Sequence, residues 1–386
     1  MRDVAFIAGA TCLVSWLYLL TANGGFWRVS RLGAPVPPRQ NLGGTIAVVI
    51  PARDEAGAIG ATVQSLLAQT YAQAIRIVVV DDHSSDGTAE AARRAASDSG
   101  RAEAVDVITG RPLPSGWTGK VWAMQQGVEQ AMQTNPAFLL LTDADIQHDA
   151  DNVATLVAIA ESGNYDLTSF MVKLHCRSLA ERLLIPAFVF FFFMLYPPVW
   201  ISEQRRKTAG AAGGCMLVRP QALQRAGGMA AIRDRIIDDC ALAAAVKRSG
   251  GRVWLGVTPG TRSTREYASF AEIERMIART AFHQLRHSAL LLVGSLLGLA
   301  ITYLLPIALL LTGEPQLVAL GAMSWLLMAM AYAPMVRFYG LTPAWALTLP
   351  AAAVFYMAAT VHSAVKFWSG RGGEWKGRAQ DVPSTR

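Results

Sequence analysis

Apolar and polar positions alternate along the middle of the chain in a way that predicts strands and helices in turn. From residue 45 onward, four short β-branched runs are each followed by a stretch with helical periodicity. The predicted strands cover residues 45–50, 75–80, 105–108 and 138–141, and the predicted helices cover residues 57–69, 87–97, 121–132 and 152–162. This alternation is typical of an α/β fold with a mostly parallel, doubly wound sheet.

Longer apolar runs occupy both ends of the chain. The first covers residues 4–22, and three more cover about 288–311, 316–336 and 341–365. Crossing a hydrocarbon core takes roughly 20 apolar residues, so each run is a candidate transmembrane helix. Between residues 288 and 365 the only formal charges are Glu314 and Arg337. The pattern predicts four units: an N-terminal transmembrane anchor (1–27), a central domain (28–287), C-terminal transmembrane helices (288–365) and a basic tail (366–386).

The first apolar run is either a membrane anchor or a cleaved signal peptide. Arg2 and Asp3 stand where a signal peptide has a basic cluster, and no clear small-residue cleavage site follows, which favours the anchor. Arg28, Arg31 and Arg39 come directly after the run. The positive-inside rule therefore places the central domain in the cytoplasm.

The basic charge of the tail conflicts with this orientation. With the N-terminus outside and four spans, residues 366–386 would lie outside, although they include Lys366, Arg371, Lys376 and Arg378. Either the tail departs from the positive-inside tendency, or one apolar run does not cross the membrane. Four spans remain the working count.

The composition agrees with a membrane-bound globular protein. Of the 386 residues, 52% are hydrophobic and 16% are charged, and the mean hydropathy is +0.30, which excludes a disordered, collagen-like or disulfide-framework chain. The four cysteines lie far apart and have no CxxC spacing, so neither a zinc site nor a disulfide frame is predicted. The net charge of +7 has no polybasic block. It fits the inner face of an anionic membrane better than nucleic-acid binding, which is not predicted.

Acidic residues gather where three of the predicted strands end. They lie in the segments 51–55 (PARDE), 81–88 (DDHSSDGT) and 143–145 (DAD). Ligands of open α/β sheets bind beyond the carboxyl ends of the strands, and carboxylates grouped there repel one another unless a cation is bound. Asp143 and Asp145 are two apart in an extended segment and point the same way, which suits a magnesium or manganese ion on phosphate. For residues 86–88 alone, a helix cap explains the pattern equally well.

Four longer motifs follow one another along the central part of the chain: VVIPARDEAGAIGATVQSLLAQTY, VVVDDHSSDGTAEAA, GWTGKVWAMQQGV and LLLTDADI. In this order they resemble the motifs of family 2 glycosyltransferases, which have the GT-A fold, and the resemblance covers about residues 45–260. More narrowly, AERLLIPAFVFFFFMLYP, GGCMLVRPQAL, IIDDCALAAAVK and RTAFHQLRHS resemble the hopene-associated glycosyltransferases of bacteria that make hopanoid lipids. The resemblance implies a multi-pass enzyme of the bacterial inner membrane that moves a sugar from a nucleotide-sugar donor, such as a UDP-sugar, to a lipid acceptor.

The resemblance also implies roles for residues on the donor side. Asp82 would contact the uracil or other base, Asp143 would face the ribose and base, and Asp145 would bind Mg or Mn on the diphosphate. Lys120 would offset phosphate charge, with a solvated lysine at a helix start as the alternative. The floor of the nucleotide pocket would be formed by Pro51, Ala52 and Glu55.

An inverting transfer needs a base that takes the proton of the acceptor hydroxyl. Asp238 and Asp239 begin a predicted helix at the place where the family usually has Glu-Asp, with the second carboxylate as the base. By this resemblance Asp239 is the predicted base. Asp238, shorter than the usual glutamate, is a helper whose role stays open. Two acidic residues that complete a helix N-terminus are the alternative, because they would interact favourably with the helix dipole.

Processive polysaccharide synthases of this family carry a Gln-x-x-Arg-Trp motif before their membrane helices. Residues 276–280 keep only Arg279, which would bind the diphosphate or form a surface ion pair. The missing tryptophan favours transfer of one sugar to a lipid. A processive synthase and a non-catalytic membrane scaffold that retains the fold are the alternatives.

The segment 183–200 is rich in phenylalanine and tyrosine and is interrupted by three prolines. It is short for a span and has charged flanks, so it is predicted to lie in the membrane interface and to bring the acceptor's head group to the site. A buried core helix is the alternative.

Overall fold

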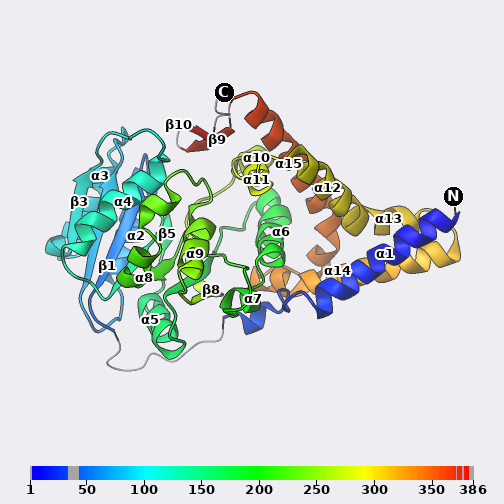
Figure 1. The fold of residues 1–386 in the computed structure, drawn as a ribbon, viewed down its shortest axis with the longest axis horizontal. Helices are drawn as coiled ribbons and strands as arrows, with labels where there is room; N and C mark the ends of the chain where they lie inside the picture. Colours follow the sequence, from blue (N-terminus) through cyan, green and yellow to red (C-terminus); the bar gives the residue numbers. More distant parts are fainter. Residues whose placement is uncertain (1, 34–42, 371, 376–377, 382–386) are drawn as a thin grey trace.

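The computed structural model describes residues 2–33, 43–370, 372–375 and 378–381. An α/β domain forms one end of the molecule, and long apolar helices extend from it toward the other end (Figure 1). Arg39, Arg371 and Lys376, which entered the orientation argument, lie outside the described residues.

The first half of the sheet follows the predicted pattern. Its strands are β1 (Ile46–Ala52), β2 (Ile75–Asp81), β3 (Val105–Thr109) and β4 (Phe138–Leu141), and the helices are α2 (Ala56–Leu67), α3 (Thr88–Asp98), α4 (Gly119–Met132) and α5 (Asn152–Ser162). The strands lie in the order β3-β2-β1-β4 and pair in parallel. Every residue of β1 is buried, as expected for an apolar strand covered on both faces. The predicted strands and helices are all present, with ends shifted by at most two residues.

The second half of the sheet is partly antiparallel, and its strands were not predicted. They are β5 (Ile146–Gln147), β6 (Leu167–Lys173), β7 (Met216–Val218) and β8 (Val253–Ser263). The order continues β4-β7-β6-β8-β5, with β7 antiparallel to β4 and β6. Ile146 pairs with Ser263, so the end of β8 lies beside the acidic turn that follows β4. The predicted α/β fold class is confirmed, with a mixed sheet.

Short helices connect the second half of the sheet and lead to the apolar helices. They are α6 (Leu179–Leu195), α7 (Pro198–Ser202), α8 (Pro220–Arg225), α9 (Asp238–Arg248), α10 (Phe270–Ala278) and α11 (Ala281–Gln284). Three 3₁₀ turns, η1 (Val29–Arg31), η2 (Ala102–Ala104) and η3 (Met229–Ile232), and a terminal hairpin of β9 (Gly372–Trp375) and β10 (Arg378–Asp381) complete this part.

Four helices are long and apolar enough to cross a membrane, among the residues that the structure describes. They are α1 (Arg2–Thr21), a continuous helix over Ala289–Leu310, α14 (Pro315–Phe338) and the helical segment Pro343–Trp368. The second consists of α12 (Ala289–Leu299), the π-helical turn η4 (Ala300–Leu304) and α13 (Leu305–Leu310), and the fourth consists of η5 (Pro343–Thr348) and α15 (Leu349–Trp368). The observed helices match the four predicted apolar runs.

Helix α1 packs against α13 and α14 and belongs to the folded helical bundle (Figure 1). Near its middle, the indole Nε1–H of Trp16 donates to the carbonyl of Thr302 at 2.9 Å. At its N-terminal end, Arg2 pairs with Glu314 in the loop between α13 and α14 at 3.2 Å. These contacts are what an anchor retained in the folded protein would make.

Helix α6 joins the α/β domain to the apolar helices. Ser178 and Glu181 form a capping box at its N-terminus. Further along, the rings of Phe190 and Tyr332 lie 5.2 Å apart, and the ring of Phe191 lies 5.0 Å from that of Tyr356. Of the seven rings in the segment predicted to lie in the interface, three are buried between helices (Phe190, Phe191 and Phe193) and four are half-buried, so its place in the membrane interface stays a prediction.

Candidate active site

A single cavity of about 1730 Å³ extends from the strand ends of the α/β domain to the apolar helices. Its polar end is lined by Glu55, Asp143, Asp145, Asp238 and Asp239 together with Lys120, Arg265 and Arg279. Its apolar end is lined by side chains of α1, α6, α12, η4 and α15. The structure thus brings together nearly all of the residues predicted for the site.

Lys120 links the predicted donor side to the acidic pair at the start of α9. Its ammonium lies 2.9 Å from Asp143 and 3.2 Å from Asp238. Burial opposes the positive charge of Lys120, but the carboxylates of Asp143 and Asp238 outweigh this and raise its pKa above the usual value. Burial likewise opposes ionisation of Asp143, and the charge of Lys120 nevertheless lowers its pKa. The solvated-lysine alternative is wrong, because Lys120 is at the centre of a charged cluster.

Asp239 has the properties of a general base. It lies in the first turn of α9, where its Oδ2 accepts the N–H of Gly213 at 2.9 Å and its Oδ1 accepts the N–H of Cys240 at 2.7 Å. Burial and the neighbouring charge of Asp238 raise its pKa to about 6, against the opposing effect of Lys120. A carboxylate with a pKa of about 6 is a stronger base than an exposed carboxylate, whose pKa is lower, and it is still mostly ionised at pH 7.

Arg265 is a charged residue of the cavity that the sequence reasoning missed. Its guanidinium bridges two acidic residues, with Nε 2.7 Å from Asp145 and Nη2 2.5 Å from Glu55. It follows β8, and the adjacent Thr264 N–H donates to the carbonyl of Asp145 at 2.8 Å. No motif marked it, because its position depends on the pairing of β5 with β8. It adds a further positive charge to the cavity that Lys120 lines.

The carboxylates of the acidic turn have the chemistry that a divalent cation requires. Asp143 and Asp145 line the same cavity, and burial and the charge of Asp143 raise the pKa of Asp145 even though Arg265 opposes the shift. Among the described residues, no group of three or more His, Cys, Asp or Glu side chains forms a ready-made metal site. Magnesium and manganese sites of transferases commonly take one or two carboxylates and fill the remaining positions with phosphate and water. Asp145, with Asp143, would hold such an ion, which would supply positive charge to a diphosphate.

The residues predicted for the nucleotide pocket are divided between the cavity wall and the layer behind it. Pro51, Arg53 and Glu55 line the cavity, whereas Ala52 is buried in β1. Asp82 is buried behind Arg53, whose Nη1 donates to the Asp82 carbonyl at 2.5 Å and lies 3.6 Å from its carboxylate. Asp82 therefore positions Arg53 in this structure, and its contact to a base stays a prediction.

Asp86 has the structural role that the alternative interpretation gave it. Its Oδ1 accepts the N–H of Thr88 at 3.1 Å and the Thr88 hydroxyl proton at 2.5 Å, while its Oδ2 accepts the N–H of Ala56 at 2.9 Å. These bonds hold the loops after β1 and β2 together. The acidic group at the second strand end is therefore partly scaffolding.

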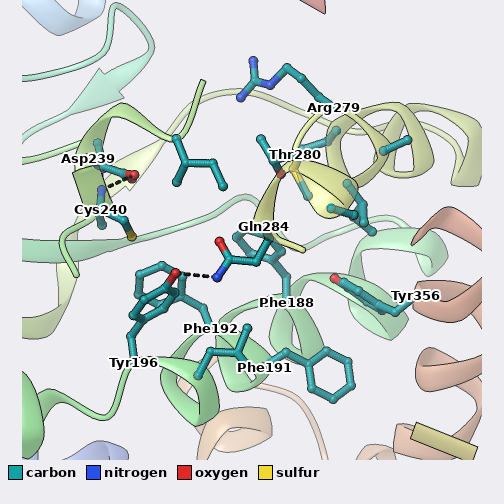
Figure 2. A pocket seen from close by; sticks show the side chains of 18 of the residues that line it. Phe188, Phe191, Phe192, Tyr196, Asp239, Cys240, Arg279, Thr280, Gln284 and Tyr356 are labelled. Atoms are coloured by element: carbon teal, nitrogen blue, oxygen red, sulfur yellow. Dashed lines mark hydrogen bonds between the residues drawn. The ribbon is translucent and has the colours of Figure 1, made fainter. Parts of the chain in front are cut away.

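Arg279 ends α10 and lines the cavity between the polar end and the apolar helices. Its positive charge adds to that of Lys120 in lowering the pKa of Asp143. In Figure 2, Arg279 and Asp239 both lie in the upper part of the view, and Gln284 and the phenylalanines of α6 lie below them. The binding of diphosphate by Arg279 stays a prediction, and its place in the cavity is compatible with it.

The wall opposite the charged residues is aromatic. Phe188, Phe191 and Phe192 of α6 and Tyr356 of α15 line it (Figure 2). Between this wall and Asp239 stand Tyr196 and Gln284, whose side chains share a hydrogen bond of 2.6 Å. The cavity therefore changes from charged to apolar within the length of a few side chains.

Comparison with known proteins identifies the central part of the chain. Residues 47–227 match the family model described as glycosyl transferase family 2. This part of the chain, slightly under half of it, is similar to family 2 glycosyltransferases. The protein is a transferase enzyme, and the predicted GT-A type of α/β fold is confirmed. A search of curated protein sequences found no match.

Solved structures share the fold at low sequence identity. The mannosyltransferase PcManGT from Pyrobaculum calidifontis, in complex with GDP-Man and Mn²⁺, is 18% identical, with a TM-score of 0.54 over 93% of this chain and 98% of that chain. Because that alignment spans nearly the whole chain, the shared fold includes most of the apolar helices. Glucosyl-3-phosphoglycerate synthase from Mycobacterium tuberculosis, with Mn²⁺, UDP and glucosyl-3-phosphoglycerate, is also 18% identical, but its TM-score of 0.39 over 60% of this chain and 75% of that chain is too low for a structural argument.

Proposed function

We propose that this protein transfers one sugar, with inversion, from a nucleoside-diphosphate sugar to a hydroxyl group of a membrane lipid. The observation that supports this is the single cavity that joins the charged cluster to the apolar helices. A water-soluble acceptor would not need an aromatic wall or a groove between helices. A lipid has both a polar group for the charged end and a hydrocarbon for the apolar end.

The donor would bind at the polar end, with its diphosphate near Lys120, Arg265 and Arg279. All three cations line the cavity, and PcManGT, which shares the fold, is described with GDP-Man and Mn²⁺. Following the motif resemblance, a UDP-sugar is our first choice of donor, and a GDP-sugar is the second to test. The cations would stabilise the negative charge that develops on the leaving diphosphate.

Asp239 would act as the base in a single displacement. It takes the proton from the acceptor hydroxyl as the hydroxyl oxygen attacks the anomeric carbon, and the bond from that carbon to the diphosphate oxygen breaks with its electron pair leaving on the phosphate. No covalent enzyme intermediate is needed. The anomeric configuration is therefore inverted.

The presence of this base favours an alcohol acceptor over a lipid phosphate. A phosphate monoester is already ionised at pH 7, so it needs no base, and the carboxylates of Asp238 and Asp239 would repel it. An alcohol must lose its proton during attack. A hopanoid alcohol, or a related polyprenyl-derived alcohol, is the acceptor that the motif resemblance suggests, and its rigid or branched hydrocarbon suits an aromatic wall.

The proposal places the protein in the bacterial inner membrane with the catalytic domain on the cytoplasmic side, where nucleotide sugars are made. The direct test is sugar transfer in membranes that contain the full-length protein, with radiolabelled UDP- or GDP-sugars, Mg²⁺ or Mn²⁺, and mass spectrometry of the extracted lipids. A lipid that gains one sugar supports the proposal. Long polymer products would indicate a processive synthase, and full cellular function of an Asp239→Asn variant would indicate a scaffold.

A further inference from the structure

Two residues from distant parts of the chain meet between the base and the aromatic wall. Tyr196 follows the last residue of α6, and Gln284 is the last residue of α11. The Gln284 Nε2–H donates to the Tyr196 hydroxyl oxygen at 2.6 Å. Figure 2 shows the pair with Asp239 on one side and Phe188 and Phe192 on the other. Both residues line the cavity.

The Tyr196 ring is held firmly in place. It lies 5.1 Å from the ring of Phe192, and the backbone of Gly210 lies against it so closely that a Cβ there would be 3.2 Å from the ring. Burial, followed by the nearby Cys240, raises the pKa of Tyr196, so the hydroxyl keeps its proton at pH 7. Because Gln284 donates to the Tyr196 oxygen, the Tyr196 proton is not used in that bond; it faces the side chain of Cys240, and an acceptor hydroxyl would replace Cys240 as its partner.

We infer that Tyr196 and Gln284 form the site that holds the acceptor's hydroxyl group in front of Asp239. This inference rests on the proposed function. An alcohol oxygen has one proton and two lone pairs. The proton goes to Asp239, one lone pair accepts the hydrogen bond from Tyr196, and the other attacks the anomeric carbon. Gln284 fixes the Tyr196 hydroxyl and is a positioning residue, while the hydrocarbon of the acceptor lies along Phe188 and Phe192.

The test removes one hydroxyl from the protein and one from the lipid. Tyr196→Phe keeps the ring, and Tyr332→Phe is its matched control, because Tyr332 packs its ring 5.2 Å from that of Phe190 in α6 but does not line the cavity. The probes are a hopanoid alcohol and its parent hydrocarbon in vesicles of phosphatidylethanolamine and phosphatidylglycerol. The alcohol is assayed as acceptor, and both compounds are assayed as competitors.

Tyr196→Phe should raise the KM for the hopanoid alcohol by about 2- to 10-fold, the value of one hydrogen bond. The KM for the donor and the slow hydrolysis of the donor without acceptor should not change, and Tyr332→Phe should match the wild type. The alcohol should compete better than the hydrocarbon in the wild type and lose that advantage in Tyr196→Phe. Gln284→Ala should show a smaller change in the same direction.

Two outcomes separate the inference from the proposed function. If the wild type glycosylates the alcohol and Tyr196→Phe has an unchanged KM for it, the inference is overturned and the proposed function stands. If the wild type hydrolyses the donor but glycosylates no lipid alcohol, the proposed function fails and the inference fails with it.

A second inference concerns the last apolar segment, and different contacts support it. The chain leaving α14 turns back along that helix, and the Trp325 Nε1–H donates to the carbonyl of Leu347 in η5 at 3.3 Å. Trp325 is 10 residues after Pro315 and 13 before Phe338, which at 1.5 Å per residue puts it about 15 and 20 Å from the two ends of α14. Residue 347 therefore lies near the middle of α14.

Helix α15 then returns toward the catalytic domain. The Tyr356 hydroxyl donates to the carbonyl of Leu184 in α6 at 3.0 Å, and the Phe282 N–H donates to the Ser363 hydroxyl at 3.0 Å. Lys366 lines the same cavity as Asp239. In Figure 1, α15 ends beside α10 and α11, whereas α1, α13 and α14 extend away from the α/β domain.

The geometry points to a re-entrant segment over η5 and α15, with three full spans formed by α1, α12–α13 and α14. Three spans before this segment leave the tail on the side of the catalytic domain. The basic residues of the tail then follow the positive-inside tendency, which four spans do not allow. The conflict found in the sequence is removed.

Tags in the full-length protein test this arrangement. One tag follows residue 386, a second is inserted at Gly100 in an exposed turn of the α/β domain, and a third is inserted at Gly313 between α13 and α14. In sealed vesicles, a protease or antibody should reach the first two tags from the same side and the third from the opposite side. Access to the C-terminal tag from the same side as Gly313 would overturn the inference and restore four spans.

Discussion

The two ends of the cavity are built on different principles. At the polar end, carboxylates and cations come from the ends of strands and the ends of helices, and several of the charges are paired, as Lys120 is with Asp143 and Arg265 is with Asp145. At the apolar end, aromatic rings and small residues of long helices form the wall. The first end fixes atoms in place through directional bonds, whereas the second only excludes water and provides room. We therefore expect mutations at the polar end to change the rate of chemistry and mutations at the apolar end to change acceptor binding.

The largest effect is expected for the base. Asp239→Asn keeps the size of the side chain but cannot accept the proton, so kcat should fall by about 100- to 10,000-fold. Donor binding, measured by isothermal titration with the nucleoside diphosphate, should change little. Asp98→Asn, which makes the same change at an exposed carboxylate at the end of α3, serves as the control. A kcat for Asp239→Asn close to that of the wild type would remove this residue from the mechanism.

The predicted ligand of the divalent cation should come next. Asp145→Ala should lower transfer by at least about 100-fold, since a metal ion supplies several kcal/mol of charge stabilisation to a transferring phosphate. Binding of Mn²⁺ in the presence of the nucleoside diphosphate, followed by electron paramagnetic resonance, should weaken in parallel. Unchanged Mn²⁺ binding would mean that the ion, if required, is held elsewhere.

A smaller and different effect is expected at the apolar end. Gly298 of α12 lines the cavity, and an added Cβ there would meet nothing within 4 Å, so Gly298→Leu would fill part of the groove without a clash in the helix. The KM for the lipid acceptor should rise by about 5- to 100-fold, the range that corresponds to 1–3 kcal/mol of overpacking. Donor hydrolysis without acceptor should stay the same.

Gly294 provides the matched control for this substitution. It lies one helical turn earlier on α12, also has nothing within 4 Å of an added Cβ, and is not part of the cavity lining. Gly294→Leu should therefore behave like the wild type. Equal effects of the two leucines would show that the acceptor does not use this groove.

The smallest effect is a shift in pH dependence. Asp239 must be ionised to act as the base, and its pKa is raised to about 6, so kcat/KM should fall as the pH drops through about 6. Asp238→Asn removes one negative neighbour that raises this pKa. The acidic limb should then move to lower pH, by up to about one unit. If the acidic limb of the pH profile stays at the same pH, it reports the titration of a group other than Asp239.

The two halves of the sheet show how far the sequence could be interpreted. Strands β1 to β4 are short runs rich in apolar residues, interrupted only by Arg76 in β2 and Asp106 in β3 before the strand ends, and this local pattern was sufficient to predict them. Strand β5 has two residues and β7 has three, which is too short for a period to be recognised. Arg265 was missed for this reason, because its position follows from the pairing of β8 with β5.

The sequence by itself determined the kind of chemistry and the presence of apolar helices. Asp143, Asp145 and Asp239 stand in short motifs, and a motif is local because neighbouring residues set the turn that presents them. Tertiary structure alone decided which charges meet, as in the contact of Lys120 with Asp238 across 118 positions. It also placed Tyr196 beside Gln284 and turned the last apolar segment back toward the catalytic domain. Such contacts depend on how helices and strands pack over long sequence distances, and periodicity along the chain does not encode that packing.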